Sequence, residues 1–415
     1  MTTTPTTTRS ARLDEYAAVV GKPEIHELRA LAGRLAGKRV KMVNSTAVGG
    51  GVAEILHRQV PLMEELGVPT RWEVITGGAE FFAVTKAFHN ALHGAPYEGR
   101  PEWLEIFLAT NEENRRRIEF EEDFVVIHDP QPIALVNARN RSHGRWIWRC
   151  HIDLSHANPQ VWEFLRPFVE RHDAAVFSSP AFAHGLPIPQ YLFFPTIDPL
   201  ADKNRELEPE FVAGVFERFG IDRKRPIITQ ISRFDRLKDP RGVVQAFRIV
   251  RRHTDCQLVL AGGSAADDPE GMAVLHEVEE AAQGDPDIHI LNLPPWSHLE
   301  INALQRGSTI VLQKSLREGF GLTVSEALWK RRPVIASAVG GIPSQVIHKL
   351  TGMLVHSIEG TAYQIRFLLS NPDFARKLGE NGHEHVREHF LITSKLKRYL
   401  LLCLILQEGS GPGGS

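Results

Sequence analysis

The chain has 415 residues, with 48 lysines and arginines against 50 aspartates and glutamates, so its formal net charge is −2. This balance excludes the strongly basic composition of a dedicated nucleic-acid-binding protein and the acidic composition of a disordered chain. The length predicts two or three domains, and the hydrophobic share of 42% is enough to fill their cores. The three cysteines, Cys150, Cys256 and Cys403, have no metal-binding spacing, so we expect a reducing, cytoplasmic location.

The first half of the chain alternates short apolar runs with helical patterns. Strands are predicted at residues 39–44, 71–75, 124–128, 146–150 and 174–178. A Gly-rich turn at 48–51 leads into a helix. Apolar runs this short, bounded by turn residues, are typical of buried parallel strands.

The pattern breaks at 195–204, where two prolines and several polar residues indicate a domain boundary. A second series follows, with strands predicted at 227–231, 257–261, 288–291, 309–312 and 333–336, and helices at 241–252, 271–282 and 323–330. Two alternating blocks predict an α/β fold with two doubly wound parallel-sheet domains. We expect the domains at 1–205 and 206–390, a helix at 391–408 that packs back on the first domain, and a linker or tag at 409–415.

Ligands of such sheets bind beyond the carboxyl ends of the strands, so we expect the site in a cleft between the two domains. Glu318 and Glu326 flank a Gly-rich helix start after the strand at 309–312. The four residues after the first carboxylate are Gly319, Phe320, Gly321 and Leu322. Glycines permit close backbone approach, and N–H groups at a helix start bind anionic oxygens, so a diphosphate would fit here. The alternative is a helix whose acidic residues only complement its dipole.

Two cations, Arg233 and Lys238, follow the strand at 227–231 and could neutralise a leaving diphosphate; the alternative is a solvated basic loop. Two more Gly-rich turns follow strands, at Gly50–Gly51 and at Gly262–Gly263. The first lacks the complete G-x-G-x-x-G spacing and a Walker lysine, and the second could border a nucleotide base or ribose. A purely structural role stays open for both turns.

Together these motifs resemble glycosyltransferase family 4 of the GT-B superfamily, over residues 40 to 391. The resemblance is carried by the E-x7-E pair Glu318 and Glu326, by Arg233 and Lys238, and by VGGIP at 339–343. Four further segments narrow it to the group of trehalose glycosyltransferring synthases and trehalose phosphorylases. They are NSTAVGGGVAE from Asn44, HDPQP from His128, WRCHID from Trp148 and FLIT from Phe390.

For the donor, the resemblance implies that Arg233 and Lys238 grip the diphosphate and stabilise it as it leaves. Glu326 would accept hydrogen bonds from the ribose hydroxyls. Glu318 would contact the transferred glucose, beside the backbone of Gly319 to Leu322. The glycines at 262–263 would border the nucleotide.

For the other half of the site, the resemblance implies that His151 lies near the donor sugar. Asp129 and Gln131 would lie on the acceptor side with His128 nearby, and the turn Gly50–Gly51 would let the backbone approach the donor. The alternative is that the histidines only cap strand ends and that Asp129 only initiates a turn before proline.

The activity implied is the reversible, retaining transfer of glucose from a nucleoside diphosphate glucose (ADP- or UDP-glucose) to free glucose, which forms trehalose. No pair of carboxylates can be assigned the roles that a retaining glycosidase needs, so we expect a same-face attack in which the departing diphosphate takes the acceptor proton. The alternative is a trehalose phosphorylase that uses inorganic phosphate. An NAD-linked oxidoreductase, which would need the missing G-x-G-x-x-G, and a non-catalytic sugar sensor are less favoured.

We expect no tightly bound cofactor and no dedicated metal site, with Mg²⁺ as a candidate assistant of the diphosphate. Asp285 and Asp287 form a D-x-D, but they lie in a turn before a strand, which disfavours a metal-binding role. The expected partners are the nucleotide sugar and glucose or trehalose, with no nucleic acid and no membrane, and a homodimer stays open. The apolar run at 399–406 is too short to span a bilayer.

Overall fold

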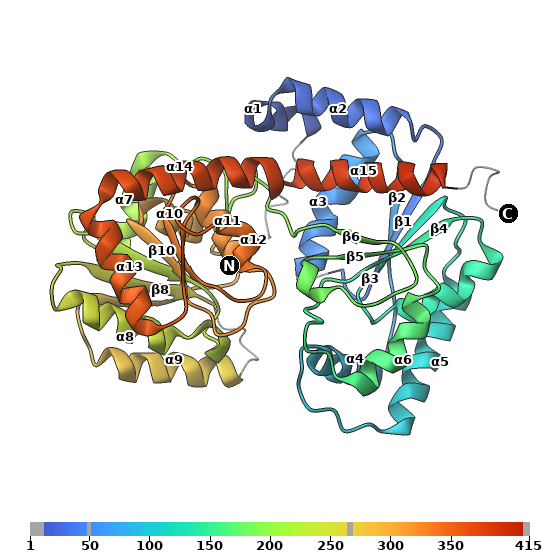
Figure 1. Cartoon of the computed structure of the whole chain (residues 1–415), viewed down its shortest axis with the longest axis horizontal. Coiled ribbons are helices and arrows are strands. Elements are labelled where there is room, and N and C mark those ends of the chain that lie inside the picture. The colour runs from blue at the N-terminus through green and yellow to red at the C-terminus, as the bar shows by residue number, and fades with distance from the viewer. Residues whose placement is uncertain (1–11, 48–50, 264–268, 410–415) are drawn as a thin grey trace, which may run out of the picture. The chain divides into compact units, whose positions relative to one another are not determined.

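The computed structural model describes residues 12–47, 51–263 and 269–409. The chain divides into two compact units. Unit 1 comprises Met1–Phe194 and Thr393–Ser415, and unit 2 comprises Pro195–Ile392. Each unit contains a six-stranded parallel sheet with helices packed around it (Figure 1). Unit 1 is therefore assembled from two separate stretches of the chain, whereas unit 2 is continuous.

The sheet of unit 1 has the strand order β2-β1-β3-β4-β5-β6. Its strands are β1 (Val40–Asn44), β2 (Thr70–Val74), β3 (Phe124–His128), β4 (Arg145–Arg149), β5 (Ala174–Phe177) and β6 (Gln190–Leu192). The chain moves from β1 outward to β2 and then returns to add β3 on the other side. The loops after β1 and β3 therefore diverge at a topological switch point, the place where α/β sheets bind ligands.

The helices of unit 1 are η1 (Leu13–Tyr16), α1 (Ala17–Val20), α2 (Lys22–Gly33), α3 (Gly51–Glu65), α4 (Ala79–Leu92), α5 (Pro101–Arg117), η2 (Ile133–Arg141), α6 (Pro159–Val169) and η3 (Pro180–Phe182). The last helix, α15 (Ile392–Glu408), begins with the final residue of unit 2 and continues in unit 1. It runs beside α2 (Figure 1), and ion pairs at both ends of α2 hold the two helices together.

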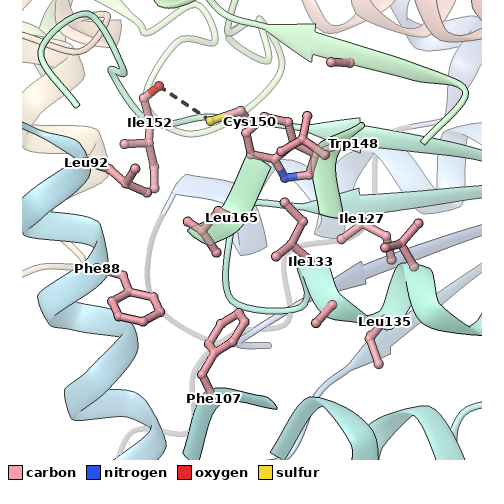
Figure 2. Packing of buried hydrophobic residues seen from close by; sticks show 14 of the residues in the cluster. Phe88, Leu92, Phe107, Ile127, Ile133, Leu135, Trp148, Cys150, Ile152 and Leu165 are labelled. Atoms are coloured by element: carbon pink, nitrogen blue, oxygen red, sulfur yellow. Dashed lines mark hydrogen bonds between the residues drawn. The ribbon is translucent and has the colours of Figure 1, made fainter. Parts of the chain in front are cut away.

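A large apolar core fills one side of the unit 1 sheet. Figure 2 shows members of this core, with Phe88 of α4 beside Phe107 of α5, and with Leu165 of α6 between these rings and Trp148 of β4. The indole Nε1 of Trp148 donates to the carbonyl oxygen of Asp129 at 3.2 Å. The core therefore supports the turn that follows β3, where the sequence predicts acceptor-binding residues.

The sheet of unit 2 has the order β12-β11-β10-β7-β8-β9. Its strands are β7 (Ile227–Ile231), β8 (Gln257–Gly262), β9 (Ile288–Asn292), β10 (Ile310–Gln313), β11 (Val334–Ser337) and β12 (Met353–Val355). The first strand lies in the middle, so the switch point falls between β7 and β10. The loops after these two strands carry the basic pair and the E-x7-E motif, respectively.

The helices of unit 2 are α7 (Pro209–Arg218), η4 (Arg236–Lys238), α8 (Pro240–Arg251), α9 (Pro269–Ala282), α10 (His298–Gly307), α11 (Leu322–Trp329), α12 (Ile342–Gln345), α13 (Ile358–Ser370) and α14 (Pro372–His389). Side chains of β7 alternate between two cores. Ile228 joins the core under α8, α9 and α13, while Ile227 and Ile231 join the core under α7 and α10. Both faces of the sheet are thus covered, as expected for parallel strands.

The structure confirms the predicted α/β class and the parallel-sheet, Rossmann-like organisation of both units. The ten predicted strands are present, most of them shifted by one residue at an end. Two further strands, β6 and β12, were not predicted. Each has three residues and lies at a sheet edge. The residues of β6 are largely exposed, and β12, although two of its three side chains are buried, is too short to give the apolar run that marks a central strand. Among the helices that the structure describes, none combines the length and apolarity needed to cross a membrane.

Candidate active site

Two loops of unit 2 meet where its strand order reverses, the loop at 232–239 after β7 and the loop at 314–321 after β10. Gln230, near the end of β7, bonds to both. Its Nε2 donates to the carbonyl oxygen of Lys238, and its Oε1 accepts from the backbone N–H of Lys314, both at 2.9 Å. One buried amide therefore fixes the two predicted motifs side by side.

The structure joins two of the predicted site residues, Lys238 and Glu318. The Nζ of Lys238 donates to Oε2 of Glu318 at 2.6 Å. The same oxygen accepts from Ser315 Oγ at 3.2 Å and from Gln313 Nε2 at 3.3 Å. The two charged side chains are only 18% and 9% exposed, respectively. The Glu318 carboxylate is thus held in one position by three donors, and the sequence did not predict this contact.

Arg233, the other predicted cation, lies on the same loop in a different environment. Its side chain is 70% exposed, and its Nη2 lies 3.5 Å from Oδ2 of Asp235. An exposed pair at this distance is weak. The guanidinium can therefore turn toward an anion that binds at the switch point.

Glycines shape the start of α11. Gly321, which caps the helix, has φ +80°, and Gly340, on the loop after β11, has φ +54°. A Cβ atom on Gly340 would lie 1.6 Å from the carbonyl oxygen of Glu318. The next N–H, of Gly341, donates to the carbonyl oxygen of Gly319 at 2.9 Å. The loop after β11 thus presses on the Glu318 loop so closely that only glycine fits.

The other predicted residues of this loop contribute in different ways. The ring of Phe320 is buried, with its centroid 5.7 Å from that of Phe390, and the Phe320 carbonyl oxygen accepts from Gln345 Nε2. Its ring therefore serves packing, and a donor contact would come from its backbone. Leu322 is the first residue of α11, where N–H groups have no acceptor within the helix and remain available to a phosphate.

Glu326 lies within α11 and is largely buried. One turn later, Lys330 is also buried, and its Nζ donates to the carbonyl oxygen of Glu326 at 3.1 Å, to Gln305 Oε1 at 2.7 Å and to Asn204 Oδ1 at 3.1 Å. Burial lowers the pKa of Lys330 to about 7, against the attraction of Glu326. Sequence reasoning missed Lys330, which directly follows the helix and gives no local signal of its burial.

Gly262 is the last residue of β8, one residue beyond the predicted end of the strand, and Gly263 follows it. A Cβ on Gly262 would lie 1.7 Å from the carbonyl oxygen of Ser232, and one on Gly263 would lie 2.7 Å from that of Leu293. Close backbone packing therefore accounts for both glycines. Their contact with a nucleotide stays a prediction.

In unit 1, Asp129 occupies the turn directly after β3 with φ +64°. Its backbone N–H donates to the carbonyl oxygen of Arg149 at 2.9 Å, and its Oδ1 accepts from the backbone N–H of His151 at 2.7 Å. Burial raises the pKa of Asp129 to about 7, while the bond from His151 and the charge of Arg149 oppose the rise. The carboxyl therefore changes its charge near neutral pH.

His128 and His151 lie together beside this carboxyl. His128 Nδ1 and His151 Nε2 are 3.1 Å apart, and the two rings stack with centroids 5.4 Å apart. Burial lowers the pKa of both histidines well below the ordinary value. Two neutral imidazoles can share one hydrogen bond, one as donor and the other as acceptor, which fixes their orientation.

Gln131 lies two residues beyond Asp129. Its carbonyl oxygen accepts from Asn111 Nδ2 at 3.0 Å. Its amide Oε1 is buried and has no hydrogen-bond partner among the described residues. The predicted Gly50 lies outside the described residues, and Gly51 is the first residue of α3. The proposed contact of these glycines with the donor stays a prediction.

Further residues around the two loops were not assigned from the sequence. Asp239, with φ +47°, caps α8 and forms an ion pair with Lys314, so it ties the loop after β7 to the loop after β10. The Asp-Pro step is a recognisable helix start, but its lysine partner is 75 positions away. In unit 1 the buried Lys395 was also missed, and the buried Arg149 of the WRCHID segment was given no role in the site.

The D-x-D motif at 285–287 is engaged by arginines in the structure. Asp287 of the D-x-D accepts from Arg225 Nη1 at 2.6 Å and pairs with Arg251, and these bonds hold its pKa at about 2. This carboxylate is thus occupied by two guanidinium groups. Across 12–47, 51–263 and 269–409, no group of three or more His, Cys, Asp or Glu side chains could hold a metal ion.

Two family models match the chain, and each falls within one unit. The model described as "Trehalose synthase, N-terminal domain" matches residues 42–184, in unit 1, and "Glycosyl transferases group 1" matches residues 215–385, in unit 2. Solved structures of low identity show the same fold. Sucrose-phosphate synthase from Thermosynechococcus elongatus (TM-score 0.69, 19% identity) aligns with 90% of this chain and 100% of its own. An alpha,alpha-trehalose-phosphate synthase from Burkholderia vietnamiensis (TM-score 0.69, 14% identity) aligns with 91% and 99%.

Sequence relatives give the family. The chain is 42% identical to a trehalose synthase from Pyrococcus horikoshii over 94% of this chain and 95% of the relative. It is 44% identical to a trehalose synthase from Rubrobacter xylanophilus over 94% and 96%. A trehalose phosphorylase from Pleurotus pulmonarius is 30% identical over 96% of this chain and 61% of the relative. With two Rossmann-like units of the GT-B type and full-length matches at this level, the chain belongs to the trehalose synthase family of glycosyltransferases.

Proposed function

We propose that the chain transfers glucose, with retention, from a nucleoside diphosphate glucose to free glucose and so forms trehalose. Relatives named trehalose synthase, 42–44% identical over nearly their whole length, support a glycosyl transfer that involves trehalose. The observation that carries it is the Lys238–Glu318 pair, set at the switch point of unit 2 beside the start of α11. This arrangement combines a fixed cation, a fixed carboxylate and the N–H groups of a helix start, which suit a sugar diphosphate.

In the proposed reaction, the bond between the anomeric carbon of the donor and its phosphate oxygen breaks. A new bond forms from the same face between that carbon and the anomeric hydroxyl oxygen of the acceptor. The acceptor proton passes to the departing phosphate oxygen. Arg233, Lys238 and the start of α11 stabilise the charge that develops on the diphosphate, and preorganised groups of this kind supply much of the rate acceleration in enzymes.

Glu318 is proposed to bind hydroxyl groups of the transferred glucose. Three donors already fix its carboxylate, so it meets the sugar without reorganising. Its ion pair with Lys238 also has a cost, because the lysine must be shared with the diphosphate when donor binds. Glu326 is proposed to accept from the ribose hydroxyls.

On the acceptor side, Asp129 is proposed to accept a hydrogen bond from the incoming glucose, with Gln131 and His128 beside it. The orphaned Oε1 of Gln131 would gain a partner from a sugar hydroxyl. His151, whose backbone N–H already bonds to Asp129, is proposed to position the donor sugar.

Product analysis tests the proposal. The chain is incubated with glucose and ADP-, UDP- or GDP-glucose, and a non-reducing disaccharide and the free nucleoside diphosphate are measured. We expect equal amounts of both products and an α,α linkage by NMR. The exposed carboxylate of Glu359 on α13 provides a matched control: Glu318→Gln should abolish turnover while Glu359→Gln should not. Absence of disaccharide with every nucleotide sugar would overturn the proposal, and a β linkage at the donor carbon would overturn retention.

A trehalose phosphorylase is the second candidate, and the 30% identity to the enzyme from Pleurotus pulmonarius favours it. Inorganic phosphate would then take the place of the diphosphate beside Arg233 and Lys238. Breakdown of trehalose is measured with phosphate, ADP or UDP as the only co-substrate. Formation of glucose 1-phosphate, with no reaction with either nucleotide, would replace the first proposal by the second.

A further inference from the structure

Three fully buried bases lie behind the partly exposed Asp129 and His151 of unit 1. Arg149 and Lys395 are both 0% exposed, and His128 is 1% exposed. Asp129 and His151 form an outer layer that a substrate can reach, whereas the three bases form an inner layer. The inner layer can therefore act on a substrate only through the outer one.

Strand pairing places the backbone of Arg149 next to that of Asp129. In the register of β3 and β4, His128 lies opposite Arg149, and the N–H of Asp129 donates to the Arg149 carbonyl oxygen at 2.9 Å. The guanidinium is anchored by neutral groups, because its Nη2 donates to Ser178 Oγ at 3.0 Å and to the carbonyl oxygen of Phe193 at 2.7 Å. Its nearest hydrogen-bond partners therefore leave its positive charge uncompensated.

Lys395 reaches the same place from α15, at the other end of the sequence. Its Nζ lies 5.9 Å from the centre of the Tyr399 ring, and that ring packs edge-on against Phe193 at 5.1 Å. Ion pairs fasten α15 to α2, including Lys397 to Glu27 at 2.6 Å. The position of Lys395 is thus set by a docked helix and not by a contact of its own ammonium group.

Several donors of the inner layer have no acceptor. Lys395 Nζ, both Nε and Nη1 of Arg149, and His128 Nε2 lack a hydrogen-bond partner among the described residues. These atoms are sealed from solvent as well. An isolated charge in such surroundings is costly, so the charges of the cluster must balance within it.

The groups that face one another here come from β3, β4, the following loop and α15. Around Asp129 and the two histidines they are Arg149, Cys150, Lys395 and Tyr399. Burial raises the pKa of Cys150, and it raises the pKa of Tyr399 to about 12, so neither supplies a negative charge near neutral pH. Burial and the charge of Arg149 lower the pKa of Lys395 and of both histidines, which favours their neutral forms.

We propose that the guanidinium of Arg149 is the buried counter-charge that keeps the Asp129 carboxylate ionised, and that Lys395 lies beside them as an uncharged amine. Arg149 is then a positioning residue for the acceptor site, although no substrate touches it. An arginine keeps its proton in proteins, so it suits a permanent counter-charge. Among Arg149, Asp129, His128, His151 and Lys395 the charges then balance, with one cation, one anion and three neutral bases. Arg398 of α15, which stacks over Phe194, is a further cation whose charge interacts with that of Arg149.

The proposal rests on the proposed function in one respect, the contact between Asp129 and the acceptor. Trehalose formation is measured against pH in the full chain and in Arg149→Met. In the pH profile of kcat/KM, the rise on the acidic side (the acid limb) should move to higher pH by about one unit when the counter-charge is lost. At pH 7 this shift lowers kcat/KM about fivefold, and above pH 9 the variant and wild type should have the same kcat/KM. Arg149→Lys, which restores a charge, should bring the limb back toward its original pH. An Arg149→Met limb at the wild-type pH would overturn the proposal.

Lys395→Met tests whether the Lys395 side chain is uncharged. This variant remains informative if Arg149→Met does not fold. If Lys395 is uncharged, the acid limb of Lys395→Met should lie at the same pH as that of wild type. A shift of this limb as large as that in Arg149→Met would overturn the assignment. The control is Lys397→Met on the same helix, which removes the ion pair to α2 but no member of the cluster.

Thermal melting gives a readout that is independent of activity. Because burial depresses the pKa of Lys395, the unfolded chain binds a proton that the folded chain does not, from that lowered pKa up to about pH 10.4. Wild-type stability therefore rises with pH through this window. Lys395→Met should melt higher than wild type at pH 7, and the difference should shrink toward pH 10. A difference in Tm that is the same at every pH would overturn the uncharged amine, whether or not the chain makes trehalose.

Discussion

Lys238 and Glu318 form the closest ion pair among the predicted donor residues, and Lys238→Met separates its two roles. The lysine holds the Glu318 carboxylate now, and it is proposed to face the diphosphate during the reaction. We predict that Lys238→Met lowers kcat by a large factor, while it lowers the free energy of unfolding and the nucleotide affinity only modestly.

The magnitudes follow from the geometry of the pair. At the 2.6 Å between Nζ and Oε2, unit charges attract by about 6 kcal/mol with an effective dielectric constant of about 20. Desolvation of two largely buried groups offsets most of this attraction, and Glu318 keeps the bonds from Ser315 and Gln313, so the stability loss should be about 1–3 kcal/mol. Loss of one preorganised charge at the leaving group should lower kcat about 100- to 1000-fold.

The assay measures trehalose formation at saturating donor and acceptor, nucleotide affinity by calorimetry, and Tm. The exposed Lys377 of α14 provides the control, because Lys377→Met removes a lysine that has no role in the site. The double variant Lys238→Met/Glu318→Gln should be less damaging than the sum of the single changes, since the two side chains are in contact. A kcat within about threefold of wild type, with nucleotide affinity strongly reduced, would show that Lys238 serves ground-state binding only and would refute the reasoning.

Three further predictions follow from single residues. Gly340→Ala should lower turnover about tenfold or more and lower Tm, because its Cβ would overlap the carbonyl oxygen of Glu318. The control is Gly33→Ala, whose Cβ meets no atom within 4 Å. Equal effects of the two substitutions would contradict the prediction. Activity should rise with pH through about 7 as Asp129 ionises, and this limb should be absent from the residual activity of Asp129→Asn; an unchanged limb would assign it to another group. Lys330→Met should lower the free energy of unfolding by about 1–3 kcal/mol, because it leaves three acceptors unpaired. The lowered pKa of Lys330 makes wild-type stability rise between pH 7 and about 10, and the substitution should weaken this rise. A Tm equal to that of wild type would contradict the prediction.

The central strands were predictable because buried parallel strands leave a local signal. The strands at 124–128 and 227–231 match the structure residue for residue, since both are short apolar runs with polar or turn residues at their ends. The edge strands β6 and β12 leave no such signal, because each has only three residues and those of β6 are largely exposed.

Within the candidate site, individual residue types were predictable but their mutual contacts were not. Lys238 and Glu318 are 80 positions apart, and only the adjacency of β7 and β10 brings them together. The need for glycine at 340 arises from a carbonyl oxygen of another loop. Arg149 and Lys395 are 246 positions apart, and no spacing in the sequence links them.

The division of unit 1 between two stretches of chain has a consequence for biosynthesis. A ribosome releases residues 1–194 first, but this part lacks α15 until the segment from Thr393 has left the exit tunnel. Unit 2 is continuous and can fold in the meantime. The half of the protein that is translated first is thus completed last, and a nascent chain would have no finished environment around Asp129 until Lys395 and Tyr399 arrive.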